Sequence, residues 1–308
     1  MKYVITGGAG FIGNNIAKLL IKKGHDVDII DNLHTGRKEN LKEIIDKINF
    51  YQIDIQKKND LEKIIKNCDG IFHEAALTAV PESFEKPKEY HDVNVIGTKN
   101  IFEIAQKENI RAVYASSSSI YGDVKNTPIK ENADRKPINP YGQTKLDNEF
   151  LAEKLSKNNV SIIGLRYFNV YGIGQTGSYA GVITKFLENI KNQKSFIVNG
   201  NGNQIRDFIH VKDVAQANIT AMESKTKNGF FNIGTGIPTS INDLAKLMIE
   251  LSNHKYEIIH GPQLEGDIEI SQADMNFTNK SFNWSHKINL KEGLRDLIKN
   301  YLSLNSYK

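Results

Sequence analysis

The stretch "KYVITGGAGFIGNNIAKLLIKKG", residues 2–24, decides the fold class of this chain. Residues 2–6 form a short β-branched run that is typical of a strand, and residues 14–24 have the apolar spacing of a helix that stops at Gly24. The glycines between them fit two overlapping patterns: Gly8, Gly10 and Gly13 as G-x-G-x-x-G, and Gly7, Gly10 and Gly13 as G-x-x-G-x-x-G. Glycines let the backbone approach a pyrophosphate, and a helix N-terminus attracts it. The stretch therefore predicts a nucleotide-binding strand, turn and helix.

An acidic residue at the end of the second predicted strand strengthens this prediction. Residues 26–30 read as a strand, and Asp31 follows it, 18 residues after Gly13. A carboxylate there accepts hydrogen bonds from ribose hydroxyls and repels a 2′-phosphate, which favours NAD over NADP. Arg37 and Lys38 in the next loop could hold that phosphate, so NADP stays an alternative.

Strands and helices then alternate along the first half of the chain. We expect strands at 48–55, 70–76, 111–119 and 160–172, and helices at 60–67, 93–109 and 141–158. Alternation of this kind predicts a doubly wound parallel α/β sheet whose ligands lie beyond the carboxyl ends of the strands. The cofactor contacts that we predict from this rule and from the glycine turn are Gly7, Gly10, Phe11, Ile12, Gly13, Asp31, Asn32, Asp54, Ile55, Ala75 and Ala76.

The stretch "NPYGQTK", residues 139–145, places a tyrosine and a lysine one helical turn apart. Asn139 is a good N-cap and Pro140 suits the first turn, so Tyr141 and Lys145 share a face near the positive helix end. A tyrosine has a pKa of about 10, and lowering it by ~3 units needs ~4 kcal/mol. A nearby cation, the helix dipole and an NAD⁺ ring together could supply that. A serine of the run at 116–119 could complete a proton path.

Composition restricts the classes of protein that this chain can belong to. Among 308 residues, 40 are basic and 36 acidic, and they are well interspersed, which argues against nucleic acid as a partner. Cys68 is the one cysteine, so no internal disulfide is possible and a reducing compartment is expected. We see no signal peptide and no apolar run of 18 residues, which predicts a soluble cytoplasmic protein.

Several motifs together carry a family resemblance. They are the glycine turn, Asp31, "SSSSIYG", "YGQTK", "LRYFNVYG" and "RDFIHVKDV". With them the chain resembles the extended short-chain dehydrogenase/reductase superfamily, and within it the UDP-glucose/UDP-galactose 4-epimerases, from Met1 to about Leu302. The resemblance implies a Rossmann NAD-binding domain at 1–166, to which 211–234 returns, and a smaller C-terminal α/β domain at 167–308 for a UDP-sugar.

The resemblance also implies roles for single residues. Tyr141 would be the base at the sugar 4-hydroxyl, Lys145 would bind the nicotinamide ribose and lower the tyrosine pKa, and Ser117 would assist. NAD would take a hydride from C4 and return it, which makes the chain an isomerase. Tyr141, Lys145, Asn94 and Tyr167 would contact the cofactor. The implied substrate contacts are Ser117, Tyr141, Phe168, Asn169, Val182, Phe196, Arg206, Asp267 and Ser271. Helices around 86–107 and 140–156 would form a homodimer.

Four positions bear on how this chain differs from its relatives. Leu264 stands where the family usually has a phosphate-binding arginine, Glu74 where an apolar residue is more common, and Thr78 where some members have lysine. Ser271 falls at the position that gates the sugar pocket. A small residue there suggests that UDP-GlcNAc and UDP-GalNAc are accepted, although one position does not fix a pocket volume.

Related activities are separated by the residues after Ser117. Sugar-nucleotide 4,6-dehydratases need an Asp-Glu pair where this chain has Ser118 and Ser119, and UDP-glucuronate decarboxylases need a glutamate at the second position. UDP-glucuronate 4-epimerases share the serine-rich turn and stay open. A non-catalytic NAD-binding regulator is disfavoured, because such relatives commonly lose the tyrosine or the lysine.

Overall fold

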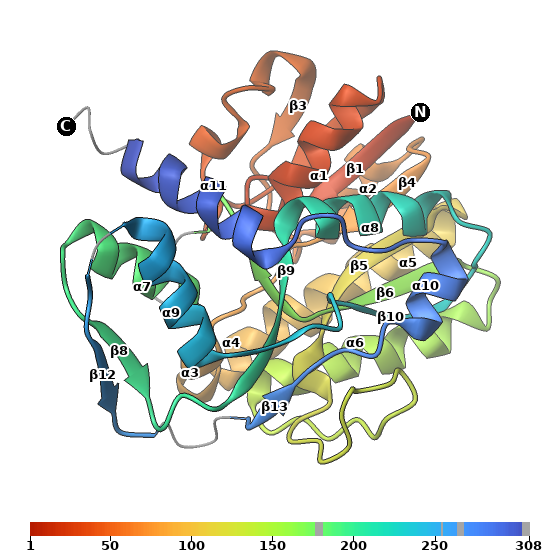
Figure 1. Cartoon of the computed structure of the whole chain (residues 1–308). Coiled ribbons are helices and arrows are strands. Elements are labelled where there is room, and N and C mark those ends of the chain that lie inside the picture. The colour runs from red at the N-terminus through yellow and green to blue at the C-terminus, as the bar shows by residue number, and fades with distance from the viewer. Residues whose placement is uncertain (176–180, 254, 264–267, 304–308) are drawn as a thin grey trace.

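The chain folds around a seven-stranded parallel sheet with helices on both faces (Figure 1). This computed structural model describes residues 1–175, 181–253, 255–263 and 268–303. The strand order is β10-β6-β5-β4-β1-β2-β3, and every neighbouring pair is parallel. The strands are β1 (Lys2–Thr6), β2 (Asp26–Ile30), β3 (Ile48–Tyr51), β4 (Gly70–His73), β5 (Arg111–Ser117), β6 (Ile162–Tyr167) and β10 (Gly229–Ile233). The predicted doubly wound sheet is confirmed.

Both faces of this sheet are buried, which explains the apolar strands. In β1, Tyr3 and Ile5 pack under α1 (Phe11–Lys22) and α8 (Val211–Glu223), whereas Val4 packs on the opposite side. That side is covered by α2 (Lys58–Ile65), α5 (Thr98–Glu108) and α6 (Pro140–Ser156). A fully buried isoleucine or valine stabilises the fold by about 1.5–3 kcal/mol, so alternate strand residues anchor the two helical layers.

Three predicted strands end earlier in the structure. The strand expected at 48–55 ends at Tyr51, the one at 70–76 ends at His73, and the one at 111–119 ends at Ser117. After the third strand, Asp54 accepts hydrogen bonds from the backbone N–H of Gln56 at 2.8 Å and from the Asn32 side chain at 2.8 Å. These side-chain hydrogen bonds take the place of strand-to-strand pairing at this position.

The strand expected at 160–172 divides at Phe168. Its first part is β6, and its second part is β7 (Asn169–Tyr171), which pairs with β9 (Ile205–His210) in another sheet. The Phe168 N–H donates to Ile233 O at 3.0 Å. Phe168 is therefore the point where the chain leaves the large sheet.

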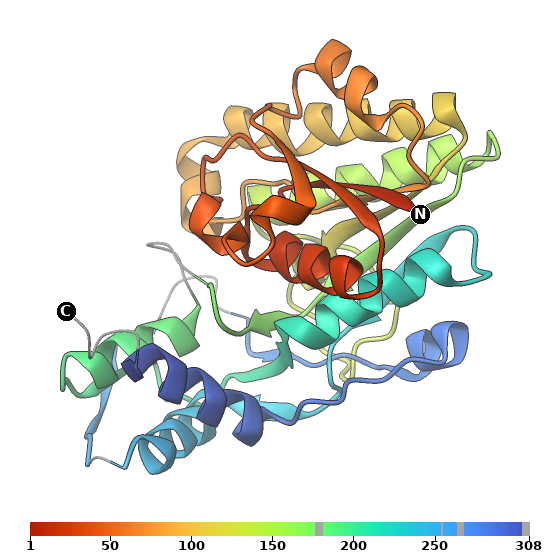
Figure 2. The same cartoon turned by 90° about the horizontal axis from the view of Figure 1, so that it is seen from above.

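The remaining elements form a second region beside the carboxyl edge of the sheet (Figure 2). A four-stranded sheet contains β7, β9 (Ile205–His210), β11 (Pro238–Ser240) and β13 (Ile270–Ser271), and a two-stranded sheet contains β8 (Phe196–Asn199) and β12 (Ile258–Gly261). Helices α7 (Val182–Lys191), α9 (Ile241–Ser252) and α11 (Leu290–Ser303) share one apolar core.

Short helices complete the connections. They are η1 (Lys38–Leu41), η2 (Ile45–Lys47), α3 (Val80–Glu85), α4 (Pro87–His91), a π-helical turn η3 (Asp92–Gly97), η4 (Ser118–Ile120) and α10 (Asn276–Phe282). Throughout the described ranges, no helix has both the length and the apolar character that a membrane crossing requires.

Candidate active site

The glycine-rich turn between β1 and α1 closes tightly against the loop that follows β4. Gly7 has a φ angle of +69°, and a Cβ atom at that position would lie 2.6 Å from the backbone nitrogen of Ala75. Gly10 is the N-cap of α1, and no side chain caps this helix. The turn therefore leaves the positive end of α1 open to an anion.

Asp31 lies directly after β2, as the sequence predicted. Its Oδ2 accepts from the Ala9 N–H at 3.0 Å and its Oδ1 from the Leu33 N–H at 2.8 Å. Burial raises the pKa of the Asp31 carboxyl, and these two backbone donors act in the opposite direction. Lys38, one of the two residues that kept NADP open, lies over the Phe50 ring, 5.2 Å from its centroid.

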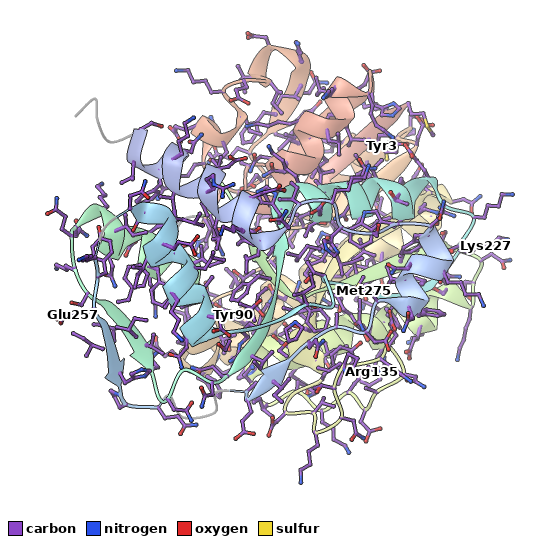
Figure 3. The ribbon with its side chains drawn as sticks, in the orientation of Figure 1. Tyr3, Tyr90, Arg135, Lys227, Glu257 and Met275 are labelled. Carbon is purple, nitrogen blue, oxygen red and sulfur yellow. The ribbon has the colours of Figure 1, made fainter. Side chains whose placement is uncertain are left out.

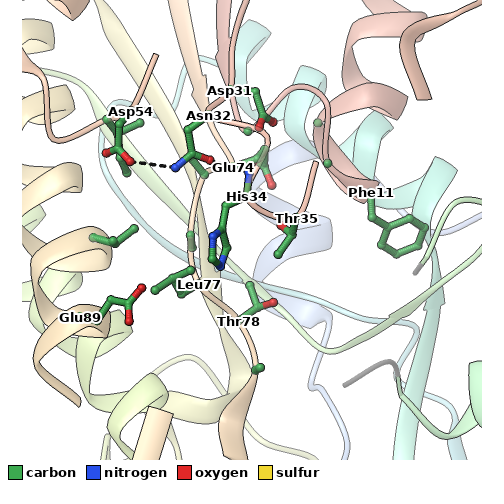
Figure 4. Close-up of a pocket in the computed structure, with 18 of the residues that line it drawn as sticks. Phe11, Asp31, Asn32, His34, Thr35, Asp54, Glu74, Leu77, Thr78 and Glu89 are labelled. Carbon is green, nitrogen blue, oxygen red and sulfur yellow. Dashed lines mark hydrogen bonds between the residues drawn. The ribbon is translucent and has the colours of Figure 1, made fainter. Parts of the chain in front are cut away.

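A cavity of about 1080 Å³ adjoins the glycine turn (Figure 4). Eleven of the cofactor contacts predicted from the sequence line it: Gly7, Gly10, Phe11, Ile12, Gly13, Asp31, Asn32, Asp54, Ile55, Ala75 and Ala76. Asn32 donates to Asp54 across its rim at 2.8 Å. Residues far apart in sequence thus meet at the carboxyl edge of the sheet, because parallel strands end there.

The three predicted catalytic residues come together beside this cavity. Asn139 caps α6 by accepting from the Gly142 N–H at 2.7 Å, which fixes the helix start. The Lys145 Nζ lies 5.8 Å from the centroid of the Tyr141 ring and donates to Ala115 O at 2.8 Å. Ser117 lies close enough to Tyr141 to act on the pKa of its phenol. The expected base, lysine and serine therefore share one cluster.

The electrostatics of this cluster come mainly from burial. Desolvation raises the pKa of the Tyr141 phenol, while the Ser117 side chain acts to lower it. Desolvation lowers the pKa of Lys145 to about 8. A buried lysine loses its proton at a lower pH than an exposed one. Nearby charges therefore decide whether Lys145 stays protonated and can stabilise a phenolate.

Members of the serine run face different partners. Ser117 Oγ donates to Ser119 Oγ at 3.1 Å, whereas Ser116 Oγ donates to the buried Glu149 carboxylate at 2.8 Å. Ser116 is thereby committed to a structural contact, and Ser117 is the member that meets Tyr141.

Four predicted cofactor contacts are not among the described residues that line the cavity: Asn94, Tyr141, Lys145 and Tyr167. Asn94 is fully buried; its Oδ1 accepts from the Leu77 N–H at 2.8 Å and its Nδ2 donates to Leu77 O at 2.9 Å. Its side chain positions the loop that bears Leu77. Tyr167 is buried and hydrogen bonds to Glu74, which does line the cavity.

Apart from Ser117, Tyr141 and Phe168, the predicted substrate contacts that the structure describes lie in the second region. Ser271 and Arg206 are register neighbours in the β13–β9 ladder. Asn169 is half-buried at the start of β7, and Val182 is half-buried at the start of α7. Asp267 and Leu264 lie outside the described residues.

Two aromatic residues of the substrate prediction are buried. Phe196 is fully buried and stacks on Phe186, with ring centroids 4.4 Å apart. Phe168 is 4% exposed and packs with Tyr121 and Ala273. The Phe196 side chain therefore belongs to the core of the second region, since nothing of its ring is left exposed.

The structure adds cavity residues that the sequence reasoning missed. Leu77 and Thr78 follow β4, His34 and Thr35 follow β2, and Val170 lies in β7. The rule that ligands lie beyond the carboxyl ends of parallel strands would also have predicted the residues that follow β2 and β4. It could not predict Val170, because the chain leaves the large sheet at Phe168, before Val170.

Comparisons with known proteins agree with this geometry. Residues 3–234 match the NAD dependent epimerase/dehydratase family. This chain belongs to that family. A provisionally named UDP-glucose 4-epimerase of Methanocaldococcus jannaschii is 38% identical over 96% of this chain and 96% of its own length. The extended short-chain dehydrogenase/reductase resemblance is confirmed.

Solved structures of epimerases have the same fold. The UDP-glucose 4-epimerase of Thermotoga maritima, crystallised with UDP-glucose, superposes with a TM-score of 0.94 at 32% identity and 99% coverage of both chains. The UDP-N-acetylglucosamine 4-epimerase of Methanobrevibacter ruminantium, in complex with UDP-N-acetylmuramic acid, has a TM-score of 0.94 at 34% identity and 98% coverage of both chains.

The cofactor of this epimerase/dehydratase family, NAD, fits the residues present. A Cβ atom on Gly13 would clash with the Gly7 carbonyl oxygen, so the turn holds its tight form only with glycine there. The exposed N-terminus of α1 suits a pyrophosphate, and Asp31 suits ribose hydroxyls.

Proposed function

We propose that this chain catalyses the NAD-dependent C4 epimerisation of a UDP-hexose, with Tyr141 as the base. The observation that carries the proposal is the cluster of Tyr141, Ser117 and Lys145 beside the cavity of the glycine turn. Membership in the epimerase/dehydratase family supports the reaction class.

Each residue of the cluster has a distinct part in the proposed reaction. Tyr141 accepts the proton of the sugar 4-hydroxyl, and the Ser117 side chain acts to lower the pKa of its phenol. The Lys145 Nζ lies 5.8 Å from the phenol ring centroid, a position from which an ammonium would stabilise the phenolate. When bound, NAD⁺ supplies the oxidised ring that takes up and returns the hydrogen of C4.

One experiment tests the reaction and also identifies the sugar. The purified chain is incubated separately with UDP-glucose, UDP-N-acetylglucosamine and UDP-glucuronate, without added NAD, and followed by NMR. A new anomeric signal of the 4-epimer is expected with at least one substrate. No conversion of any of the three, in protein shown to carry NAD, would overturn the proposal.

UDP-glucuronate is included because its 4-epimerases remain the principal alternative. They share the serine-rich turn of residues 116–119. A dehydratase reaction is less well supported, since Ser118 and Ser119 offer no carboxyl group for eliminating water.

We further propose that N-acetylated UDP-hexoses are accepted, since Ser271 is small and adjoins Arg206 in the β13–β9 ladder. Ser271→Tyr should lower the rate with UDP-GlcNAc at least tenfold more than the rate with UDP-glucose, because a bulky ring costs about 1–3 kcal/mol in an overpacked pocket. Equal effects on both substrates would contradict this.

Assembly and location are also proposals. We propose a cytoplasmic homodimer joined through the segments 86–107 and 140–156, with no nucleic-acid or membrane partner. We also retain the proposed division into an NAD domain at 1–166, with 211–234 returning to it, and a UDP-sugar domain at 167–308. The pairing of β10 with β6 supports the return of that segment.

A further inference from the structure

Ser83 is a hydroxyl beside the active site for which the proposed reaction so far has no use. It lies in the short helix α3, and its side chain is completely buried. Ala79, before this helix, and Glu82, within it, line the cavity that adjoins the glycine turn. A buried hydroxyl costs free energy unless its hydrogen bonds are made. The partners of Ser83 therefore indicate what it does.

The hydroxyl proton of Ser83 is used within α3 itself. Ser83 Oγ donates to Val80 O at 2.6 Å, three residues back along the chain. The oxygen keeps its lone pairs, and it accepts from the backbone N–H of Tyr141 at 3.2 Å. Ser83 thus joins α3 to the second residue of α6 across 58 positions of sequence.

This hydrogen bond supplies an acceptor that α6 lacks. The first N–H groups of a helix have no partner within the helix. In α6, Pro140 has no N–H to satisfy, and Asn139 Oδ1 accepts from the Gly142 N–H at 2.7 Å. The Tyr141 N–H lies between these two positions, and Ser83 is its acceptor. The start of α6 is therefore completed by a side chain from another helix.

The carbonyl group of Tyr141 is held in a matching way. Thr144 Oγ1 donates to Tyr141 O at 2.8 Å and accepts from Asn94 Nδ2 at 3.1 Å. Asn94 also bonds to the backbone of Leu77, which Figure 4 shows at the cavity. Two buried hydroxyls, those of Ser83 and Thr144, thus hold both backbone groups of Tyr141. Through α3 and Leu77, each connects Tyr141 to the border of the cavity.

We propose that Ser83 is a positioning residue for Tyr141: by accepting from its N–H, Ser83 fixes the start of α6 against the α3 segment that lines the cavity. The catalytic meaning of this inference rests on the proposed function, in which Tyr141 is the base. A misplacement of about 1 Å can cost about 10²-fold in rate, so the backbone position of a base matters. The hydrogen bond itself does not depend on the reaction.

The decisive experiment measures hydrogen exchange of the Tyr141 amide by NMR in the full-length protein as purified. With ¹⁵N-tyrosine labelling, the Tyr141 signal is the one that disappears in Tyr141→Phe. Ser83→Ala should make this amide exchange about tenfold faster, as expected for the loss of one hydrogen bond. A general loss of stability would accelerate every protected tyrosine amide, so a change confined to Tyr141 identifies this bond. Ser83→Cys keeps the side-chain size but offers only a weak acceptor, and it should accelerate the same amide.

A matched control removes a similar hydroxyl elsewhere. Ser252 is also buried and donates three residues back, to Ile249 O at 2.8 Å, but it lies in α9 of the second region. Ser252→Ala should leave exchange of the Tyr141 amide unchanged. An unchanged Tyr141 amide in Ser83→Ala would overturn the inference, and so would a wild-type exchange rate in Ser83→Cys, since packing alone would then suffice.

Turnover gives a second readout that separates this inference from the proposed function. In active protein, Ser83→Ala should lower kcat about tenfold with little change in KM or in NAD content. An unchanged kcat would overturn the positioning role. Faster exchange of the Tyr141 amide in Ser83→Ala, in a protein whose wild-type form has no epimerase activity, would support the hydrogen bond and overturn only the proposed function.

Discussion

The proton transfer proposed at Tyr141 depends on a phenol that burial keeps protonated until a charge stabilises its anion. Tyr141 and Lys145 lie near the start of α6, Ser117 lies at the end of β5, and burial raises the pKa of Tyr141. A phenyl ring at this position keeps the packing and removes the proton acceptor. Its loss is therefore the most direct test at the scale of one residue.

We predict that Tyr141→Phe lowers kcat for UDP-hexose epimerisation by about 10²–10⁴-fold, the usual contribution of a positioned acid or base. The KM should change little, and NMR turnover assays check both. The matched control is Tyr256→Phe, which removes a hydroxyl that donates to Ile190 O at 3.1 Å in the second region. Equal loss in both variants would contradict the role of Tyr141.

His73 gives a prediction about pH and stability. Its pKa is lowered from 6.5 to about 3 in the folded chain by burial and, secondarily, by Lys145. Below pH 6.5 the unfolded chain binds a proton that the folded chain does not, so the free energy of unfolding falls as the pH decreases. We expect a loss of about 2 kcal/mol between pH 6.5 and pH 5, measured by urea unfolding. His73→Gln should flatten this dependence, and an unchanged slope in the variant would count against it.

At the scale of elements, a buried ion pair fixes α6 to the sheet. Glu149 of α6 accepts from Arg166 of β6 through Nε and Nη2, both at 2.8 Å. It also accepts from Ser116 of β5 at 2.8 Å and from Arg135 at 3.0 Å. Figure 3 labels Arg135, which lies in the loop before α6. These bonds join the helix of Tyr141 to the strand of Ser117.

Removing this carboxylate should leave a buried guanidinium without its partner. We predict that Glu149→Ala lowers the free energy of unfolding by about 3–5 kcal/mol. Glu153→Ala, one turn further along α6, breaks only an ion pair with Arg135 at 2.9 Å and should cost about 1 kcal/mol or less. Urea unfolding of both variants checks this, and similar losses would refute the special role of Glu149.

At the scale of the whole molecule, the proposed homodimer has an accessible test. Ile96 in η3 is 42% exposed and Phe150 in α6 is 48% exposed, so the two segments proposed to join the subunits each present a large apolar side chain. Burying such side chains stabilises a complex by about 25 cal/mol per Å² of apolar surface.

We predict that Ile96→Glu converts a dimer to a monomer at micromolar concentration, measured by sedimentation. Ile259→Glu, at a residue 50% exposed in β12 of the second region, should leave the assembly unchanged. A wild-type chain that is monomeric at all concentrations would contradict the proposed dimer.

The large sheet and the glycine turn could be predicted from sequence because neighbouring residues encode them. The β-branched run before Gly7, the Asn139 cap and the alternation of apolar strand residues act over a few positions, and the structure has all three. The rule that ligands lie at the carboxyl edge then placed eleven of the predicted cofactor contacts at the cavity.

Other features were decided only when distant segments packed together. Phe196 became a core residue because Phe186 and Tyr256 stack on it, and the chain changes sheet at Phe168, where Ile233 O accepts its N–H. Glu74 meets Tyr167 across 93 positions of sequence. The sequence by itself determined the fold class and the cofactor turn, since both rest on local patterns. The tertiary structure alone decided which buried charges face Tyr141, because electrostatic coupling depends on distance in space and on exclusion of water.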